Sequence, residues 1–117
     1  MKTIALSVFG DRISSRLDVA EKLMIVSADD NEVKKMQTIL LQESNPINKI
    51  NSIIELKPDV LICGGLTEVY AEKLKYSKIN VIPWVQGNSQ EILQTYLDGV
   101  LSEAENGGNK NYELQPK

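Results

Sequence analysis

Two short segments made almost entirely of apolar residues restrict the fold more than any other feature of this chain. Residues 59–63 read DVLIC and residues 79–84 read INVIPW, and a helix-like stretch follows each of them. A short apolar run between turn signals is typical of a strand that is buried on both faces of a sheet. Strands that are joined through a helix run parallel, with a right-handed crossover. The second half of the chain therefore predicts parallel strands covered by helices.

The first half of the chain predicts an antiparallel addition to this sheet. Residues 2–9 (KTIALSVF) are expected to form a first strand and residues 23–28 (LMIVSA) a second. Residues 10–22, between them, are expected to be a long loop with a helical turn near its end. The polar turn 29–32 (DDNE) then leads into a third strand, as in a hairpin. The predicted fold is a three-layer α/β/α arrangement with a mixed five-stranded sheet.

Three amphipathic helices are predicted to cover the sheet. Asn45 and Pro46 have the residue types of an N-cap and a first helical position, and Asn88 with Glu91 resembles a capping box. The expected inner faces have apolar residues at spacings of three and four. They are Ile47, Ile50, Ile53 and Ile54 in the first helix, Val69, Tyr70 and Leu74 in the second, and Ile92, Leu93, Tyr96, Leu97, Val100 and Leu101 in the third.

The domain is expected to span residues 1–101. The chain of 117 residues is 42% hydrophobic, which is enough for a single core. Residues 102–117 contain almost no large apolar side chains, so they cannot offset a backbone entropy cost of about 1–2 kcal/mol per residue. We expect this segment to be a disordered tail rather than a docking segment.

Charge and composition exclude several classes of partner. The net charge is −3, lysines and arginines form no block, and aromatic residues make up only 5% of the chain. A nucleic-acid surface usually needs a basic patch or a stacking platform, so nucleic acid and an anionic membrane surface are not expected partners. No apolar run approaches the roughly 20 residues that span a bilayer, and no signal peptide is recognisable. A single cysteine fits the reducing cytosol, so we expect a cytoplasmic protein.

The absence of histidine argues against catalysis. Without it the chain has no Ser-His-Asp or Cys-His pair, and it also lacks a CxxC pair and a histidine–carboxylate metal set. A metal-dependent hydrolase would need several carboxylates around metal ions about 4 Å apart. Only Asp11 and Asp18 lie near the expected ligand edge of the sheet. We predict that the protein is not an enzyme and has no catalytic residues.

Three turns are candidates for a binding site. They are residues 10–22, 63–67 and 83–88, and ligands of open α/β sheets bind where such turns follow the carboxyl ends of parallel strands. Gly64 and Gly65 either permit a tight turn with positive φ or allow backbone amides to approach an anion at a helix start. Neither GxGxxG nor a P-loop is present, so a nucleotide is not indicated.

The side chains of these turns permit both structural and functional interpretations. Cys63 is equally compatible with a small core residue and with a partly exposed thiolate that binds a soft metal. Arg12 and Arg16 are either solvated loop charges or an anion clamp. Trp84 is interpreted as a plug over the core rather than as a lid.

Four segments resemble a known family. They read SVFGDRISSRLDVAEKLMIV, DVLICGGLT, INVIPWVQG and EILQTYLDGVL. They are similar to the dinitrogenase iron–molybdenum cofactor biosynthesis family, the small NifX-like domains that also occur at the end of NifB. The likeness covers residues 1 to about 101. It implies a ribonuclease H-like, nitrogenase accessory factor-like fold and the binding, carrying or insertion of iron–sulfur or molybdenum-containing clusters.

The resemblance transfers to this chain only in part. The family often has His-Phe-Gly in the loop before the second strand, whereas this chain has Arg16, Leu17 and Asp18 there. The cysteine-glycine turn matches at Cys63 and Gly64. One thiolate and a cationic, amide-lined pocket therefore remain for an anionic metal–sulfide species. The predicted binding residues are Arg12, Ser14, Arg16, Cys63, Gly64, Gly65, Thr67 and Trp84, with Cys63 as the metal ligand.

We therefore predict a non-catalytic binding or carrier protein for an iron- or molybdenum-containing metal–sulfur cluster or its precursor. Its expected partners are that cluster and a protein that delivers or receives it. The alternative is a protein-interaction or regulatory module of the same fold that has lost cluster binding, which the missing histidine favours.

Overall fold

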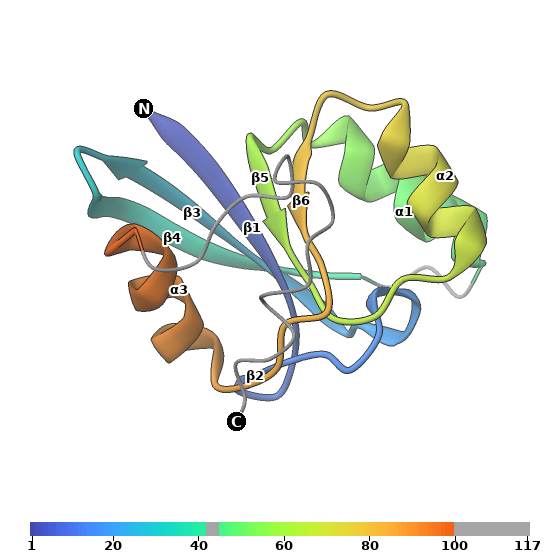
Figure 1. Ribbon diagram of the computed structural model, residues 1–117, viewed down its shortest axis with the longest axis horizontal. Coiled ribbons are helices and arrows are strands. Elements are labelled where there is room, and N and C mark those ends of the chain that lie inside the picture. Colours follow the sequence, from blue (N-terminus) through green and yellow to red (C-terminus); the bar gives the residue numbers. More distant parts are fainter. Residues whose placement is uncertain (42–44, 100–117) are drawn as a thin grey trace.

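One mixed sheet lies between two layers of helices, which confirms the predicted α/β architecture. The computed structural model describes residues 1–41 and 45–99. Its strands are β1 (Lys2–Phe9), β2 (Arg12–Ile13), β3 (Lys22–Asp29), β4 (Glu32–Leu40), β5 (Val60–Ile62) and β6 (Asn80–Ile82). Its helices are α1 (Pro46–Glu55), α2 (Glu68–Lys75) and α3 (Ser89–Leu97), with a short 3-10 helix, η1, at Leu17–Val19. Helices α1 and α2 cover one face of the sheet, and α3 covers the other (Figure 1).

The strand order explains where the loops meet. The sheet runs β4-β3-β1-β5-β6, and the short β2 pairs with the end of β1. Strand β5 is parallel to both β1 and β6, whereas β3 is antiparallel to β1 and β4 is antiparallel to β3. The parallel strands β1, β5 and β6 therefore end at one edge, as predicted, and the turns that follow them leave from that edge.

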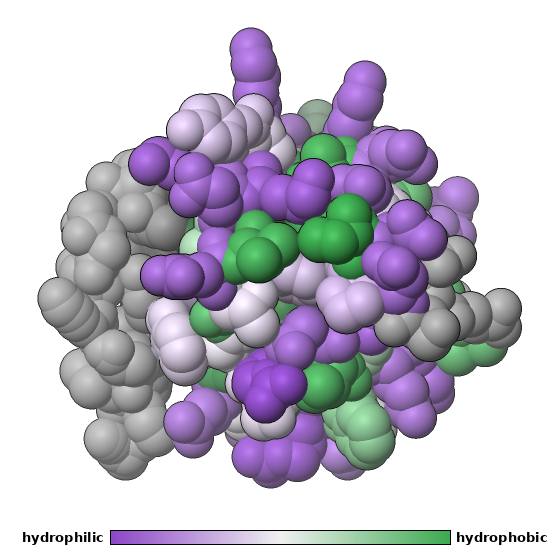
Figure 2. Space-filling view, turned by 90° about the vertical axis from the view of Figure 1, so that its right-hand side faces the viewer, coloured by the Kyte–Doolittle hydropathy of each residue, from purple (hydrophilic) through white to green (hydrophobic). Residues whose placement is uncertain are grey.

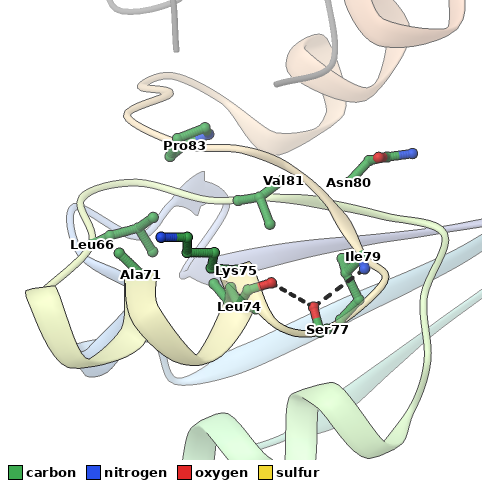
Figure 3. A pocket seen from close by; sticks show the side chains of 9 residues that line it. All are labelled: Leu66, Ala71, Leu74, Lys75, Ser77, Ile79, Asn80, Val81 and Pro83. Carbon is green, nitrogen blue, oxygen red and sulfur yellow. Dashed lines mark hydrogen bonds between the residues drawn. The ribbon is translucent and has the colours of Figure 1, made fainter. Parts of the chain in front are cut away.

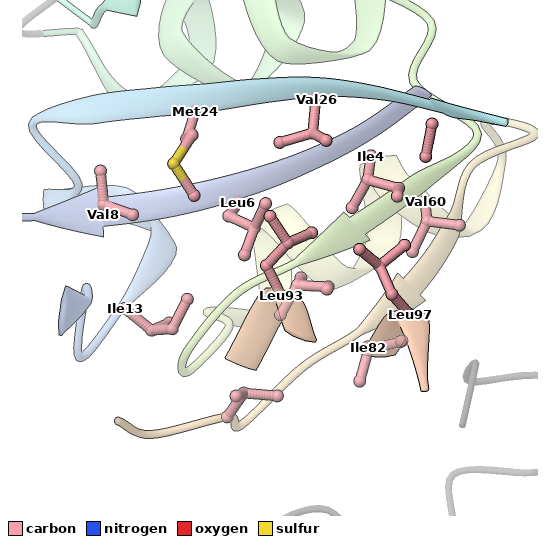
Figure 4. Close-up of a cluster of buried hydrophobic side chains, with 13 residues drawn as sticks. Ile4, Leu6, Val8, Ile13, Met24, Val26, Val60, Ile82, Leu93 and Leu97 are labelled. Carbon is pink, nitrogen blue, oxygen red and sulfur yellow. The ribbon is translucent and has the colours of Figure 1, made fainter. Parts of the chain in front are cut away.

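Alternation along the strands builds a separate core on each face of the sheet. In β1, Ile4 and Leu6 point toward α3, whereas Ala5 points toward α1 and α2. Figure 4 shows the α3 side, where Leu93 and Leu97 pack onto the strands. The parallel strand β5 is buried along its whole length because both of its faces are covered, as its continuous apolar sequence predicts.

The predicted hairpin joins β3 and β4. Asp30 and Asn31 have φ angles of 53° and 64°, which a two-residue hairpin turn of type I′ requires and which Asp and Asn tolerate. Strand β4 is almost entirely exposed because it lies at the edge of the sheet. Lys34 and Lys35, together with a bulge opposite Ser27 and Ala28, protect this edge against pairing with another strand.

The helix ends largely follow the predicted capping signals. The Asn45 side chain accepts hydrogen bonds from the amides of Ile47 and Asn48, and the Asn88 side chain accepts one from the amide of Glu91. Two predictions for inner faces are wrong. Val69 of α2 is 51% exposed, because the buried face of this short helix contains only Tyr70 and Leu74. Ile47 of α1 is 40% exposed, because it lies in the first turn of a helix whose buried residues are Lys49, Ile50 and Ile53. Val100, Leu101 and the predicted tail at 102–117 lie outside the described residues.

The long loop after β1 is more ordered than the sequence indicates. It contains β2 and η1, and the helical turn therefore lies slightly earlier than predicted. Ile13 and Leu17 are buried, so two apolar side chains anchor the loop to the domain. Within the described part of the chain, no helix is long and apolar enough to cross a membrane.

Candidate functional site

The three predicted turns lie together at the carboxyl edge of the parallel strands, and backbone hydrogen bonds join them. The amide of Ile13 donates to the carbonyl of Gly87 at 2.9 Å, and the amide of Gly65 donates to the carbonyl of Ser15 at 2.8 Å. The amide of Trp84 donates to the carbonyl of Gly64 at 2.9 Å. Residues far apart in the sequence are thus held in one rigid frame.

The two glycines of the second turn allow this close approach. A Cβ on Gly64 would lie 2.6 Å from the carbonyl oxygen of Ser15, and a Cβ on Gly65 would lie 2.8 Å from the Trp84 ring. Neither glycine has a positive φ, so the prediction that they permit a tight turn with positive φ is wrong. The Gly65 amide already donates to Ser15, so it is not free to bind an anion.

A cavity of about 550 Å³ opens where the first and third turns meet. Its lining residues come from the end of β1, the following loop and the turn after β6. They are Phe9, Arg12, Ile13, Ser14, Ser15, Val19, Val85, Gln86 and Gly87. Arg12 and Ser14 were predicted from the sequence, whereas Phe9, Val19 and Gln86 were missed. Their positions, at a strand end and beside predicted site residues, were the only available signal.

The two arginines of the first turn differ in their partners. Arg16 forms a bidentate pair with Asp18, with Nε–Oδ1 and Nη2–Oδ2 distances of 3.0 Å and 2.9 Å. The hydrogen bond from Arg16 lowers the pKa of the Asp18 carboxyl, and it raises the pKa of Arg16 in turn. Arg12 has no ion pair or side-chain hydrogen bond with the described residues, and it is the only charged residue among them that lines the cavity. Arg12 therefore supplies the unneutralised charge at this site.

Of three further predicted residues, Ser14 and Thr67 form structural hydrogen bonds, whereas Trp84 is largely exposed. Ser14 is buried, and its hydroxyl donates to the carbonyl of Arg16 at 2.7 Å. Thr67 caps α2, with its hydroxyl accepting from the amide of Tyr70 at 3.2 Å. Trp84 has a φ of 64°, an unusual value for a non-glycine residue, and its side chain is 53% exposed.

Cys63 lies in the core rather than in the cavity. Its side chain has no exposed surface and belongs to the apolar cluster that contains Leu17, Ile53 and Leu61. Burial raises the pKa of the Cys63 thiol to about 12, so the thiolate that a metal needs is strongly disfavoured. The structure therefore favours the core interpretation of this residue.

Comparison with known proteins identifies the family. A family model described as "Dinitrogenase iron-molybdenum cofactor" matches residues 1–99, a range that includes every residue the structure describes. The chain belongs to this family. The match covers all three turns of the site, and it confirms the resemblance found in the sequence.

Relatives of known structure agree with this assignment. An uncharacterised protein of Methanocaldococcus jannaschii, MJ0327, is 27% identical over 103 residues, which are 88% of this chain and 94% of that protein. Its crystal structure has a TM-score of 0.71, with 86% of this chain and 92% of that chain covered. The apo form of the orange protein from Desulfovibrio gigas has a TM-score of 0.70 at 20% identity, with 89% and 93% covered. The likeness to the orange protein supports the fold alone.

The donor set does not fit a cluster that is bound through protein ligands. Within residues 1–41 and 45–99, no group of three or more His, Cys, Asp or Glu side chains could hold a metal ion. The thiol of Cys63 is buried, and the sequence contains no histidine. The cavity instead offers the guanidinium of Arg12, the hydroxyl of Ser15 and the amide of Gln86, which hold anions by charge and hydrogen bonds.

Lys49 of α1 supports the first turn, although its role was not predicted. This lysine is buried, and its Nζ donates to the carbonyls of Asp18 and Ala20 at 3.1 Å and 3.0 Å. It therefore binds the end of η1 to the helix layer. The sequence placed Lys49 beside the inner face of α1, where a lysine is unexpected, and this position was the only signal.

A second cavity of about 520 Å³ lies between α2 and β6 (Figure 3). Leu74 and Val81 line it, and Lys75 is its only charged lining residue within the described part of the chain. Figure 2 shows this side of the molecule, where apolar side chains lie in small groups between polar ones. None of the predicted site residues lines this second cavity. The cavity of about 550 Å³ at the carboxyl edge of the parallel strands therefore remains the better candidate.

Proposed function

We propose that this protein binds and carries an anionic metal–sulfur cluster, or a precursor of one, without catalysing a reaction. The cluster would contain iron or molybdenum, in line with the family to which the chain belongs. The observation that carries the proposal is the unpaired Arg12 guanidinium in a cavity that none of the described carboxylates lines. An arginine in this setting attracts an anion without competition from a neighbouring negative charge.

The cavity holds its ligand through reversible contacts. Arg12 supplies the charge, and Ser15 and Gln86 add a hydroxyl and an amide that donate hydrogen bonds to sulfide or oxide atoms. The absence of a metal–protein bond in this arrangement makes release as simple as uptake, which suits a carrier. The other predicted site residues do not line the cavity, and their contact with a cluster stays a prediction. They are Arg16, Cys63, Gly64, Gly65, Thr67 and Trp84.

Anaerobic reconstitution tests this proposal. The intact chain is incubated with tetrathiomolybdate and copper or iron, desalted, and examined for retained metal, acid-labile sulfide and visible charge-transfer bands. We expect the wild type to retain colour and Arg12→Gln to lose most of it. Lys35→Gln is the matched control, because it also removes one positive charge but lies on the exposed strand β4, outside the cavity. A wild type that retains no colour would rule out the carrier function.

A regulatory or protein-interaction module is the second candidate. The buried Cys63 and the absence of histidine favour it, because the chain has neither of the metal donors expected at this edge. This alternative predicts that Arg12→Gln and Cys63→Ala leave the binding of a partner protein intact. A pull-down with wild type and both variants, combined with the reconstitution above, distinguishes a carrier from a module without a cluster.

A further inference from the structure

The cavity at the carboxyl edge has an apolar wall that its charge alone does not explain. Phe9 is 56% exposed and Val19 is 44% exposed, and both line the cavity that contains Arg12. Phe9 ends β1, and Val19 ends η1, so the two side chains come from the two ends of the same loop. Val85 and Ile13, which are buried, continue this apolar surface inward. The single cation thus lies beside an apolar surface as well as beside the polar side chains of Ser15 and Gln86.

Such a combination discriminates between kinds of anion. Phosphate and other compact oxyanions are strongly hydrated and are excluded from protein surfaces, so an apolar wall cannot replace the water that they lose. Sulfide-coordinated metal anions are larger and more polarisable, and they hold water less tightly. A guanidinium is itself weakly hydrated, so it pairs best with an anion that also holds water loosely. This match favours the sulfide-coordinated anion.

We propose that Phe9 and Val19 make this cavity selective for sulfide-coordinated metal anions over oxyanions of the same charge. This inference rests on the proposed function, and it assigns specificity to two residues that carry no charge. Arg12 attracts both classes of anion. The apolar wall then stabilises only the class that loses little hydration when it contacts the wall.

Binding measurements on the intact chain test the selectivity. Tetrathiomolybdate, molybdate and inorganic phosphate are compared by anaerobic equilibrium dialysis, with molybdenum or phosphorus analysis of both compartments. We expect wild type to prefer tetrathiomolybdate over molybdate. Phe9→Ala should lower the affinity for tetrathiomolybdate about tenfold and change molybdate binding by less than about twofold, because only the first ligand uses the apolar wall.

Conservative and remote variants keep the test specific. Phe9→Leu preserves an apolar side chain and should keep most of the selectivity, whereas Val19→Ser should lower it. Val33→Ser is the matched control, because Val33 is 38% exposed but lies on β4, outside the cavity. Circular dichroism and a urea titration of each variant establish that it is folded under the conditions of the dialysis.

The outcomes separate this inference from the proposed function. Equal affinity of wild type for tetrathiomolybdate and molybdate would overturn the selectivity and leave anion carriage intact. An equal loss of both ligands in Phe9→Ala, or a loss in Val33→Ser as large as that in Val19→Ser, would also overturn it. Binding of none of the three anions by folded wild type would overturn both the selectivity and the proposed function.

Discussion

At the scale of single residues, a neighbour two positions away determines which of the two arginines keeps an unpaired charge. Asp18 pairs with Arg16 through two hydrogen bonds, and the pair leaves little net charge at that point. Arg12 has no such partner among the residues that the structure describes, and it lines the cavity. The sequence shows two arginines in one loop, but it does not show which of them Asp18 will reach, so Arg12 and Arg16 could not be distinguished in advance.

Cys63 gives the stability of the protein a dependence on alkaline pH. Burial raises the pKa of its thiol from 9.0 to about 12 in the folded chain. Above about pH 8.5 the unfolded chain loses the thiol proton while the folded chain keeps it, so folded stability falls as the pH rises toward 12. Below pH 8 the thiol is protonated in both states and contributes no pH dependence.

The comparison of wild type with Cys63→Ala isolates this effect from other titrations. We expect wild type to lose on the order of 1–2 kcal/mol relative to the variant between pH 7 and pH 10. Urea unfolding of both proteins across this range measures the difference. Parallel pH profiles for the two proteins would mean that the thiol is accessible and titrates normally in the folded state.

At the scale of elements, α1 positions the loop that forms the cavity. Lys49 donates two hydrogen bonds to carbonyls at the end of η1, and Val19 of the same short helix lines the cavity. A buried ammonium that satisfies two carbonyls fixes the distance between a helix and a loop. The helix layer therefore contributes to the site without touching it.

Removal of this ammonium should destabilise the protein. Lys49→Met preserves the length of the side chain and leaves the carbonyls of Asp18 and Ala20 without their donor, so we expect a loss of about 2 kcal/mol in the free energy of unfolding. Lys34→Met is the control, since the exposed pair of Lys34 with Glu32 contributes less than about 0.5 kcal/mol. Urea titration measures both changes, and equal effects would contradict the role assigned to Lys49.

Elements whose signals are local were predictable from the sequence. The Asn45-Pro46 cap, the hairpin at Asp30 and Asn31, and the apolar strand β5 each depend on residues that are adjacent in the chain. Strand β2 was not predicted, and η1 was predicted only as a helical turn slightly later in the loop. They are only two and three residues long, and contacts with distant residues fix them, such as the bond from the Ile13 amide to Gly87.

At the scale of the whole molecule, the site depends on three turns whose backbones form hydrogen bonds with one another. The convergence of the turns was predictable, because parallel strands end at one edge. The depth of Cys63 was not predictable, since a thiol just beyond an apolar strand suits both the core and the surface. Cys63 lies in the core only because Leu17 and the helix layer pack over this position.

Gly64 is the position where this approach is most easily disturbed. In Gly64→Ala the new Cβ would collide with the backbone of Ser14 and Ser15, and we expect a loss of more than about 3 kcal/mol in the free energy of unfolding. Gly10→Ala is the control, because Gly10 has open space around it and only its φ of 68° opposes a side chain, at a cost of about 1 kcal/mol. Thermal and urea unfolding measure both changes. A tolerated Gly64→Ala would show that the first two turns can separate.

The turns at the ligand edge are fastened to one another by main-chain atoms, which every amino acid possesses. The exposed side chains that face the cavity can therefore be exchanged without loosening the backbone that positions them. Under the proposed carrier function, Phe9, Val19 and Gln86 are therefore the positions where substitutions would change the preferred ligand without changing the fold.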